Sequence, residues 1–285
     1  MALMGVTEVT NVSQREIMAN MVQQYLQGAA MFPQRIQTFT AAPGWKSVDI
    51  PRAGGFTVQT KVENVAVTPQ VLTWAVDNLP LDQHRVVQVN LEKIASLQSK
   101  VAQELQIAER AGLDLAFDTD LQIVNAFYDS ASGAGPDHII PYANASTLAG
   151  ADILEAKRLL DIQKVPQSER YLAVSPTSYS KLLAISDFVR YDAIFANQTT
   201  VGIRPGVVGT IYGFEVFMSQ AVEDLKDIAF HRTALAYGVQ QGVNYETDLD
   251  LPNLAMLHSF DQIYGLKGLD LGLRHVVLGT AAGPL

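Results

Sequence analysis

The segment from Trp45 to Asn78 reads WKSVDIPRAGGFTVQTKVENVAVTPQVLTWAVDN, and its pattern is unusual so early in a chain. Apolar and polar residues alternate in three places within it, which is typical of extended strands with one apolar face. The alternating apolar residues are Val48 and Ile50, then Phe56, Val58 and Val62, then Leu72, Trp74 and Val76. Because a two-stranded ribbon is only marginally stable by itself in water, the segment predicts a β-ribbon that needs another surface to cover its apolar face.

The composition is that of a folded globular protein. The chain has 285 residues, of which 48% are hydrophobic and 17% are charged, so it contains enough apolar material for a core. The net charge is −9 and Lys and Arg are scattered singly, which argues against a dedicated nucleic-acid binder. The N-terminus MALMGVTEVT lacks a signal pattern and no run of about 18 apolar residues occurs, so no membrane partner is expected. The absence of cysteine excludes disulfides and suits a reducing cytoplasm.

Helical periodicity flanks the ribbon on both sides. The capping box Ser13–Glu16 predicts the start of a short helix that ends near Gly28. From Asn90 to about Phe127 the apolar spacing predicts one long helix, with Gly112 as a candidate kink. Its apolar stripe would consist of Leu91, Ile94, Leu97, Val101, Leu105, Ala108 and Leu115. Downstream we expect a helix at Thr147–Gln163, strands at Arg170–Ser175 and Gly213–Ser219, and an N-cap at Ser175 followed by Pro176. The block Ile228–Gln240 would complete this mixed region, and strand-like pieces follow from Tyr245 onward.

Residues that could carry chemistry are few, and no phosphate-binding, dinucleotide, nucleophile-elbow or zincin motif is present. The histidines are isolated in sequence, so surface or hydrogen-bonded core positions are favoured over a metal site. Glu246, Asp248 and Asp250 would share one strand face, where a solvated face is favoured over a site for a hard cation. Asp137 and His138 could form an acid/base pair, but adjacency in a loop does not indicate that geometry. We therefore expect no catalytic residue, no cofactor and no metal. The histidines in question are His84, His138, His231, His258 and His275.

Several segments, in their order along the chain, resemble the major capsid (coat) proteins of tailed bacteriophages. They are IPRAGG (Ile50–Gly55), the long helix from Asn90, LLDIQKVPQSERYLAVSPTSYSKLL (Leu159–Leu183), GTIYGFEVFMSQ (Gly209–Gln220) and FHRTALAYGVQ (Phe230–Gln240). Single pieces such as YGF or VSP are ordinary strand and turn chemistry, whereas the ordered set is fairly specific. The resemblance covers most of the chain, from about Thr10 to Leu278.

The resemblance implies an α+β protein with the tailed-phage major capsid fold. Its parts would be an N-terminal arm (1–44), an extended β-hairpin loop (45–85), a peripheral domain with a spine helix (86–129), a mixed α/β axial domain (130–244) and the C-terminal strands of the peripheral domain (245–285). The apolar face of the ribbon would then lie across a neighbouring subunit. The candidate intersubunit contacts are Arg52, Phe56, Lys61, Glu63 and Trp74.

The same resemblance implies a structural protein rather than an enzyme. It would self-assemble as hexamers and pentamers into the icosahedral head shell that encloses the double-stranded DNA of the phage. Its partners would be other copies, a portal protein, scaffold and decoration proteins where the shell uses them, and packaged DNA through non-specific contacts. It would reside in the virion after assembly in the host bacterial cytoplasm. Only about 44 residues precede the ribbon, so we expect a separate scaffold protein, or none, in place of a cleaved scaffold segment.

Two alternative functions stay open. An encapsulin-type nanocompartment shell protein shares the fold but would enclose an enzyme in place of DNA. A soluble enzyme that uses His231 or the Asp137–His138 pair is the alternative from another class. Some members of the capsid family also crosslink a loop lysine to a neighbour's asparagine with help from a glutamate, which requires a neutral amine and a desolvated acid. Lys61 and Glu63 lie on the ribbon, where exposed charges explain both more simply.

Overall fold

The computed structural model describes residues 6–64, 66–92, 103–133, 138–143, 148–183, 207–269 and 273–279. The helices are α1 (Val6–Ala29), α3 (Gln103–Gly133), α4 (Gly150–Ile162) and α5 (Pro176–Leu182), with a 3₁₀ turn η2 (Arg232–Ala234). The strands are β1 (Gln37–Thr40), β2 (Ser47–Ala53), β3 (Trp74–Pro80), β4 (Gln83–Glu92), β5 (Ile139–Ile140), β6 (Arg170–Val174), β7 (Val207–Ile211), β8 (Phe214–Met218), β9 (Lys226–His231), β10 (Leu235–Asp250), β11 (Ala255–Gly268) and β12 (His275–Gly279).

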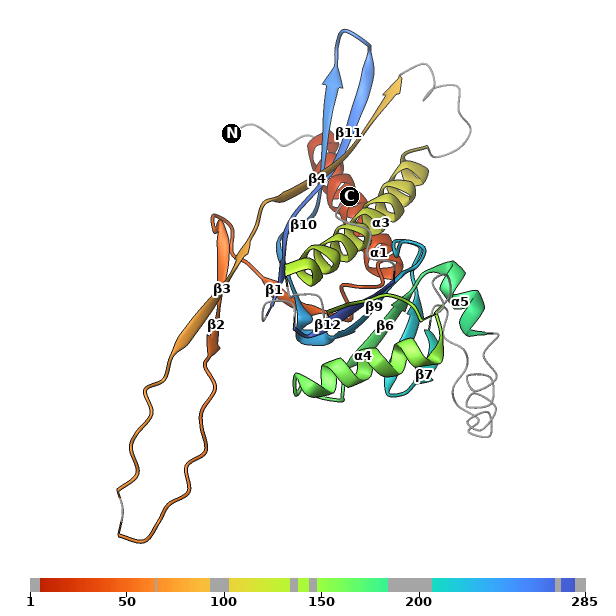
Figure 1. Ribbon diagram of the computed structural model, residues 1–285. Coiled ribbons are helices and arrows are strands. Elements are labelled where there is room, and N and C mark those ends of the chain that lie inside the picture. Colours follow the sequence, from red (N-terminus) through yellow and green to blue (C-terminus); the bar gives the residue numbers. More distant parts are fainter. Residues whose placement is uncertain are drawn as a thin grey trace, which may run out of the picture.

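These strands form three sheets, which together with the helices confirm the expected α+β class. One sheet has the order β1-β10-β11-β4, the second has the order β5-β12-β9-β6-β8-β7, and the third is the ribbon β2-β3. Figure 1 shows the ribbon standing away from the body, while the other two sheets lie close together beside α3. No helix among the described residues is long and apolar enough to span a membrane.

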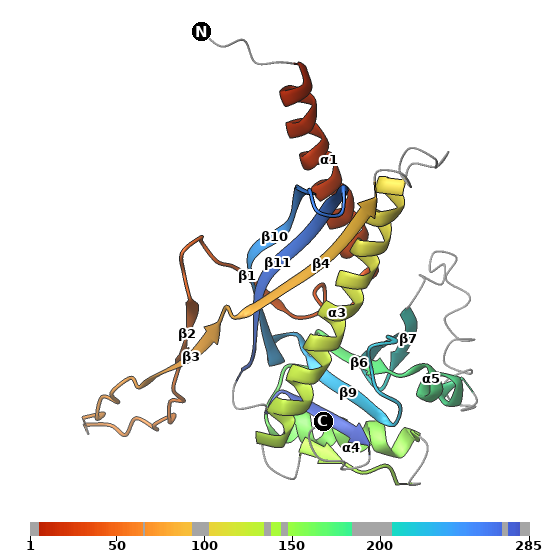
Figure 2. The same ribbon diagram turned by 90° about the horizontal axis from the view of Figure 1, so that it is seen from above.

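The long helix α3 and the N-terminal helix α1 pack on one face of the four-stranded sheet, as both views of the molecule show (Figures 1 and 2). The shared core joins Val22 of α1 and Leu115 of α3 to Phe260 of β11. A side chain at Gly112 would place its Cβ 2.7 Å from Tyr25 Cβ, so this glycine permits the close crossing of the two helices. The helix α3 continues through Gly112, and the kink there stays a prediction.

The expected starts of the first two helices are wrong, whereas the expected end of the first helix near Gly28 is confirmed, since α1 ends at Ala29. The first helix begins at Val6, so Ser13 lies inside α1 and does not cap it. The residues from Asn90 to Glu92 belong to β4, which pairs with β11 as far as the Glu92–Ala255 pair, and the helix itself starts at Gln103. Long-range strand pairing thus overrides the local helical spacing there. The stripe residues Ile94, Leu97 and Val101, and the side chain of Leu105, lie outside the described part of the chain.

The six-stranded sheet is covered on both faces. Ile153 and Leu160 of α4 pack on one face against residues of β6, β8, β9 and β12, and Phe127 of α3 packs on the other face with Phe32 and Phe230. The helix α5 begins as expected: Ser175 is its N-cap and its hydroxyl accepts a hydrogen bond from the Ser178 amide at 3.2 Å.

The five-part division of the chain stays a prediction, but three of its borders fall inside continuous elements. The border at 85/86 lies within β4, the border at 129/130 lies within α3, and the border at 244/245 lies within β10. In addition, β12, from the segment expected to hold peripheral strands, pairs with β9 and β5 in the six-stranded sheet. The chain therefore returns to this sheet close to its C-terminal end.

Candidate intersubunit surface

The ribbon consists of a short paired base and a long unpaired loop. The strands β2 and β3 pair from Ser47–Pro80 to Ala53–Trp74. Beyond this base, residues 54–64 and 66–73 form no strand ladder, and a few side-chain hydrogen bonds connect the two limbs. One example is the Thr57 amide, which donates to Gln70 Oε1 at 2.9 Å. The strand expected around Phe56 to Val62 is therefore wrong, because the extended chain there forms no strand ladder.

The exposed apolar side chains of the ribbon lie on the loop and on the adjoining end of β3, and we call them the loop surface. Their exposed fractions run from 39% at Leu72 to 96% at Val58. Large apolar side chains gathered on one protruding segment are typical of an interaction site. The loop surface comprises Phe56, Val58, Val62, Val67, Val71, Leu72, Trp74 and Val76.

The part of the base nearest the body differs from the loop in its burial. Leu79 is fully buried in a cluster with Ala236 and Leu269, and Val48 and Ile50 pack against that cluster. The expectation that the whole apolar face of the ribbon lies across a neighbour is thus wrong for Val48 and Ile50, which cover their own subunit. The base of the ribbon is therefore packed against the body, and the apolar side chains of the loop are exposed to solvent.

All five candidate contact residues lie on the ribbon, in different settings. Phe56 and Trp74 belong to the loop surface, and Lys61 and Glu63 are exposed near the end of the loop. Arg52 lies on the paired base, where its Nε is 3.9 Å from Asp77 Oδ2 across the ribbon. Their contacts with a neighbouring subunit stay a prediction.

A second group of exposed apolar residues was missed in the sequence. Leu249, Leu251, Leu254 and Met256 are 44–67% exposed at the tip of the β10–β11 hairpin, and we call them the tip surface. Leu249 and Met256 are direct partners in the ladder, so they lie on one face. The signal is present in DLDLPNLAM (Asp248–Met256), where leucines alternate with acidic residues up to a Pro-Asn turn.

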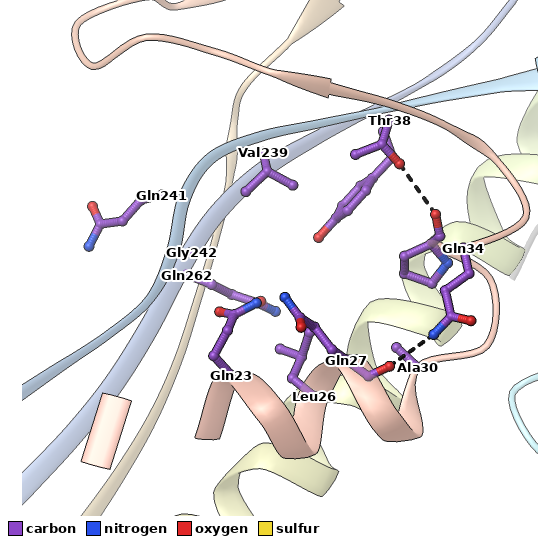
Figure 3. Close-up of a pocket in the computed structure, with 12 residues that line it drawn as sticks. Gln23, Leu26, Gln27, Ala30, Gln34, Thr38, Val239, Gln241, Gly242 and Gln262 are labelled. Carbon is purple, nitrogen blue, oxygen red and sulfur yellow. Dashed lines mark hydrogen bonds between the residues drawn. The ribbon is translucent and has the colours of Figure 1, made fainter. Parts of the chain in front are cut away.

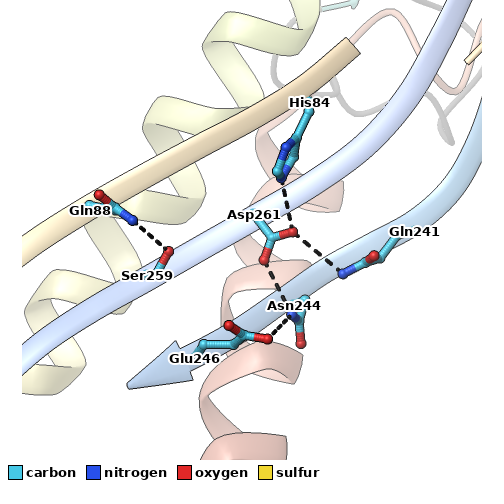
Figure 4. Close-up of polar contacts among 7 residues, drawn as sticks. All are labelled: His84, Gln88, Gln241, Asn244, Glu246, Ser259 and Asp261. Atoms are coloured by element: carbon cyan, nitrogen blue, oxygen red, sulfur yellow. Dashed lines mark hydrogen bonds and ion pairs between the residues drawn. The ribbon is translucent and has the colours of Figure 1, made fainter. Parts of the chain in front are cut away.

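The acidic residues of this hairpin share the outward face of β10, as expected. Glu246, Asp248 and Asp250 pair with alternate residues of β11, and hydrogen bonds from neighbouring amides occupy some of their oxygens. Figure 4 shows the adjoining cluster, in which Asn244 donates to both Glu246 and Asp261 at 3.2 Å, and His84 Nε2 lies 3.3 Å from Asp261 Oδ2. Within the described residues, no three His, Asp or Glu side chains are grouped so as to hold a metal ion.

The other histidines are hydrogen-bonded within the protein interior, as the sequence favoured. His138 Nδ1 lies 2.8 Å from the carbonyl oxygen of His275, and His275 Nε2 donates to the Phe127 carbonyl at 2.9 Å. Burial lowers the pKa of His275 to about 4 and also lowers the pKa of His231, whose Nδ1 lies 2.8 Å from Thr233 Oγ1. His258 Nδ1 lies 2.6 Å from the hydroxyl of Tyr245. Asp137, the other member of the acid/base pair considered for His138, lies outside the described residues.

A pocket of about 340 Å³ lies between α1, the start of β1 and β10 (Figure 3). Gln34 Nε2 donates to the Gln27 carbonyl at 3.0 Å beside it, and Leu26, Ala30 and Val239 supply apolar walls. None of the described residues that line it is charged or a histidine, so they supply no acid/base pair and no metal ligand set. The amide side chains of the pocket are those of Gln23, Gln27, Gln34, Gln241 and Gln262.

Comparison with known proteins shows the fold. No family model and no curated protein matches the sequence. Among solved structures, the capsid of the cyanophage P-SCSP1u matches with a TM-score of 0.70 at 16% identity, covering 90% of this chain and 89% of that chain. The capsid of Ralstonia phage GP4 matches with a TM-score of 0.68 at 12% identity, covering 88% and 89%. A virus-like particle from Pyrococcus furiosus matches with a TM-score of 0.62 at 13% identity, covering 93% and 99%.

These likenesses assign the chain to one architecture. It has the major capsid fold of tailed phages, as the ordered sequence segments implied. The identities are low, so what the chain does is a separate question, for which its own surfaces supply the argument.

Proposed function

We propose that this chain is a structural major capsid protein, which self-assembles into the icosahedral head shell around the double-stranded DNA of a tailed phage. One observation carries the proposal: a chain with a capsid fold holds apolar side chains on a loop that stands away from its own body. Burying such side chains contributes roughly 1.5 to 3 kcal/mol each. In a closed shell the same contact is repeated at every subunit, so modest contributions add up to a stable particle.

The proposed partners follow from this role. Copies of the chain would meet as hexamers and pentamers, with the loop surface and the tip surface both supplying contacts. A portal protein, scaffold and decoration proteins, and packaged DNA would be further partners, and the virion would be the final location after assembly in the host cytoplasm. The net charge of −9 suits a wall that touches DNA without trapping it. No catalytic step is proposed, because the buried histidines are engaged in hydrogen bonds that stabilise the fold.

The test is microscopy of the expressed protein. We expect negative-stain images and sedimentation velocity to show closed shells or their hexamer and pentamer building blocks, formed by the chain with or without a co-expressed scaffold protein. A folded chain that stays monomeric under both conditions would contradict the proposal.

An encapsulin-type shell is the second candidate, favoured by the likeness to the Pyrococcus furiosus virus-like particle. The two functions differ in what the particle contains. Particles purified from their natural source, treated with nuclease and then opened, should release protected DNA if the chain forms a phage head. Release of a single packaged enzyme, identified by mass spectrometry, would favour the encapsulin function instead.

A further inference from the structure

Two glycines face each other where the root of the ribbon crosses the four-stranded sheet. Gly238 of β10 and Gly265 of β11 are direct partners in the ladder. A Cβ on Gly265 would lie 1.8 Å from the carbonyl oxygen of Pro80 and 3.1 Å from Leu81 Cα. A Cβ on Gly238 would lie 2.8 Å from a methyl group of Leu79 and 3.0 Å from one of Leu81. The chain at 79–81 therefore rests against a patch of sheet that has no side chains.

This contact lies at the joint between the ribbon and the body. The segment 79–81 ends β3, a strand of the ribbon, and leads directly into β4, a strand of the four-stranded sheet (Figure 1). The Leu81 amide donates to the Lys46 carbonyl at 3.0 Å, which ties the two limbs together at the same point. Gln240 Nε2 donates to the Trp45 carbonyl at 2.7 Å and holds the first limb to β10. The direction of the loop relative to the body is thus set at this joint.

A small change at the joint has a large effect at the loop surface. Each limb of the ribbon has 7 residues in its strand and about ten more in the loop, which together span roughly 56 Å when extended, so a rotation of about 10° at the root moves the end of the loop by roughly 10 Å. A methyl group on Gly265 would clash with a backbone oxygen, and this clash is relieved only if the backbone itself moves. A methyl group on Gly238 meets only the ends of two leucine side chains, which rearrange more easily.

We propose that Gly238 and Gly265 are positioning residues that form a seat for the root of the ribbon and fix the angle at which the loop leaves the body. The importance of this angle for assembly rests on the proposed capsid function, whereas the angle itself is a property of the single subunit. The seat would deliver the loop surface to a neighbour in one defined direction.

The absence of cysteine in the natural sequence allows a direct measurement. Spin labels at Val58→Cys in the loop and Leu154→Cys on α4, both exposed, report the distance between loop and body in the unassembled full-length chain. In the Gly265→Ala background we expect the distance distribution to shift by several ångströms while the far-ultraviolet circular dichroism stays that of the wild type. Gly28→Ala is the matched control, because nothing lies within 4 Å of a Cβ there. An unchanged distribution in folded Gly265→Ala would overturn the seat.

Gly238→Ala keeps the proposal testable if Gly265→Ala does not fold. We expect a smaller shift in Gly238→Ala. Adding Leu79→Ala removes the nearer of the two opposing methyl groups and should reverse part of that shift. A shift that the second substitution leaves untouched would contradict the seat. Shell yield is the separate readout for function, with at least a tenfold loss expected in Gly265→Ala. A shifted distance together with normal shells would support the seat and contradict the contact role of the loop, so the two failures are distinguishable.

Discussion

The loop at residues 54–73 and the six-stranded sheet use similar apolar residues in opposite ways. In the sheet, every residue of β12 is buried, and Phe230 of β9 lies within 4.8–6.2 Å of the rings of Phe127, Phe32 and Phe217. In the loop, Val58 is 96% exposed. The apolar residues of the sheet stabilise the subunit itself, whereas those of the loop stabilise something only when a second molecule covers them.

The two regions also differ in how they treat charge. The body buries carboxyl groups that accept hydrogen bonds: Asp227 accepts from the Tyr142 hydroxyl at 2.7 Å, Asp120 accepts from the Met31 amide at 2.9 Å, and Asp152 accepts from the Ala149 amide at 2.8 Å. On the loop, Lys61 and Glu63 stay at the surface. The body thus holds carboxyl groups away from water, whereas these two charged residues of the loop stay accessible to solvent.

Removing the loop should have the largest effect on assembly and a small effect on the subunit. Replacing residues 54–73 by a short Gly/Ser linker leaves β2, β3 and the buried Leu79 in place, so we expect a helical, cooperatively melting chain that forms no shells. Circular dichroism and sedimentation velocity measure the two properties. An unfolded variant would show that the loop belongs to the subunit's own core, and normal shells would show that it is dispensable.

Single phenylalanine truncations should separate the two regions by several kilocalories. Phe230→Ala removes a fully buried ring and should lower the free energy of unfolding by about 3 to 5 kcal/mol. Phe56→Ala removes a ring that is 65% exposed and should change the same quantity by less than about 0.5 kcal/mol, while reducing shell yield. Urea denaturation of unassembled subunits gives both values. Similar losses of unfolding free energy in the two variants would contradict the division into a buried sheet and an exposed loop.

The buried acids predict an unusual pH dependence. Burial is the main cause that raises the pKa of Asp120 to about 6 from 3.8, so the folded state holds this proton more tightly than the unfolded chain. The stability linked to this proton is present at low pH and is lost as the pH rises from about 4 to 6. Asp120→Asn cannot ionise, so relative to the wild type it should gain up to about 3 kcal/mol in free energy of unfolding between pH 4 and pH 7.

His275 provides the control with the opposite sign. Its pKa is lowered to about 4, mainly by burial, so its neutral form stabilises the fold above about pH 6.5 and this stability is lost as the pH falls toward 4. Relative to the wild type, His275→Gln should therefore gain stability as the pH falls, whereas Asp120→Asn gains as it rises. Urea titrations at pH 4 and pH 7 test both, and a difference from the wild type that is independent of pH would contradict the assignment.

The smallest effect is expected at the base of the ribbon. Arg52 lies 3.9 Å from Asp77, and both side chains are partly exposed, so Arg52→Ala should cost less than about 1 kcal/mol in free energy of unfolding. Arg232→Ala, which breaks an exposed pair with Glu169 at 2.8 Å, is a matched control in the body. If only Arg52→Ala reduces shell yield, the ribbon residue acts between subunits. A loss above about 2 kcal/mol would place Arg52 among the residues that hold the subunit together.

Features that depend on neighbouring residues were predictable from the sequence. The helix cap at Ser175 was predictable because a serine hydroxyl followed by proline favours a helix start. The buried strand that starts at Arg170 was predictable because it is a short apolar run. The shared face of the acidic residues on β10 follows from the two-residue period of a strand. The order of such local pieces was enough to indicate the capsid fold.

Errors arose where distant segments meet. Leu91 fits both a helical stripe and a strand, and its pairing with Met256 of β11 decided for the strand. The candidate contacts on the ribbon were found by composition. The difference between the partly buried Val48 at the base and the exposed Phe56 on the loop was not predicted.

The sequence by itself determined the class of the fold, the local caps and strands, and the presence of an apolar ribbon near the N-terminal end, since periodicity and turn chemistry act over short distances. Only the tertiary structure decided which of the ribbon's apolar residues are covered, and that the root of the ribbon lies on Gly238 and Gly265. The physical reason is that burial and close backbone approach depend on residues more than 150 positions apart in the chain, and local spacing carries no information about which of them meet.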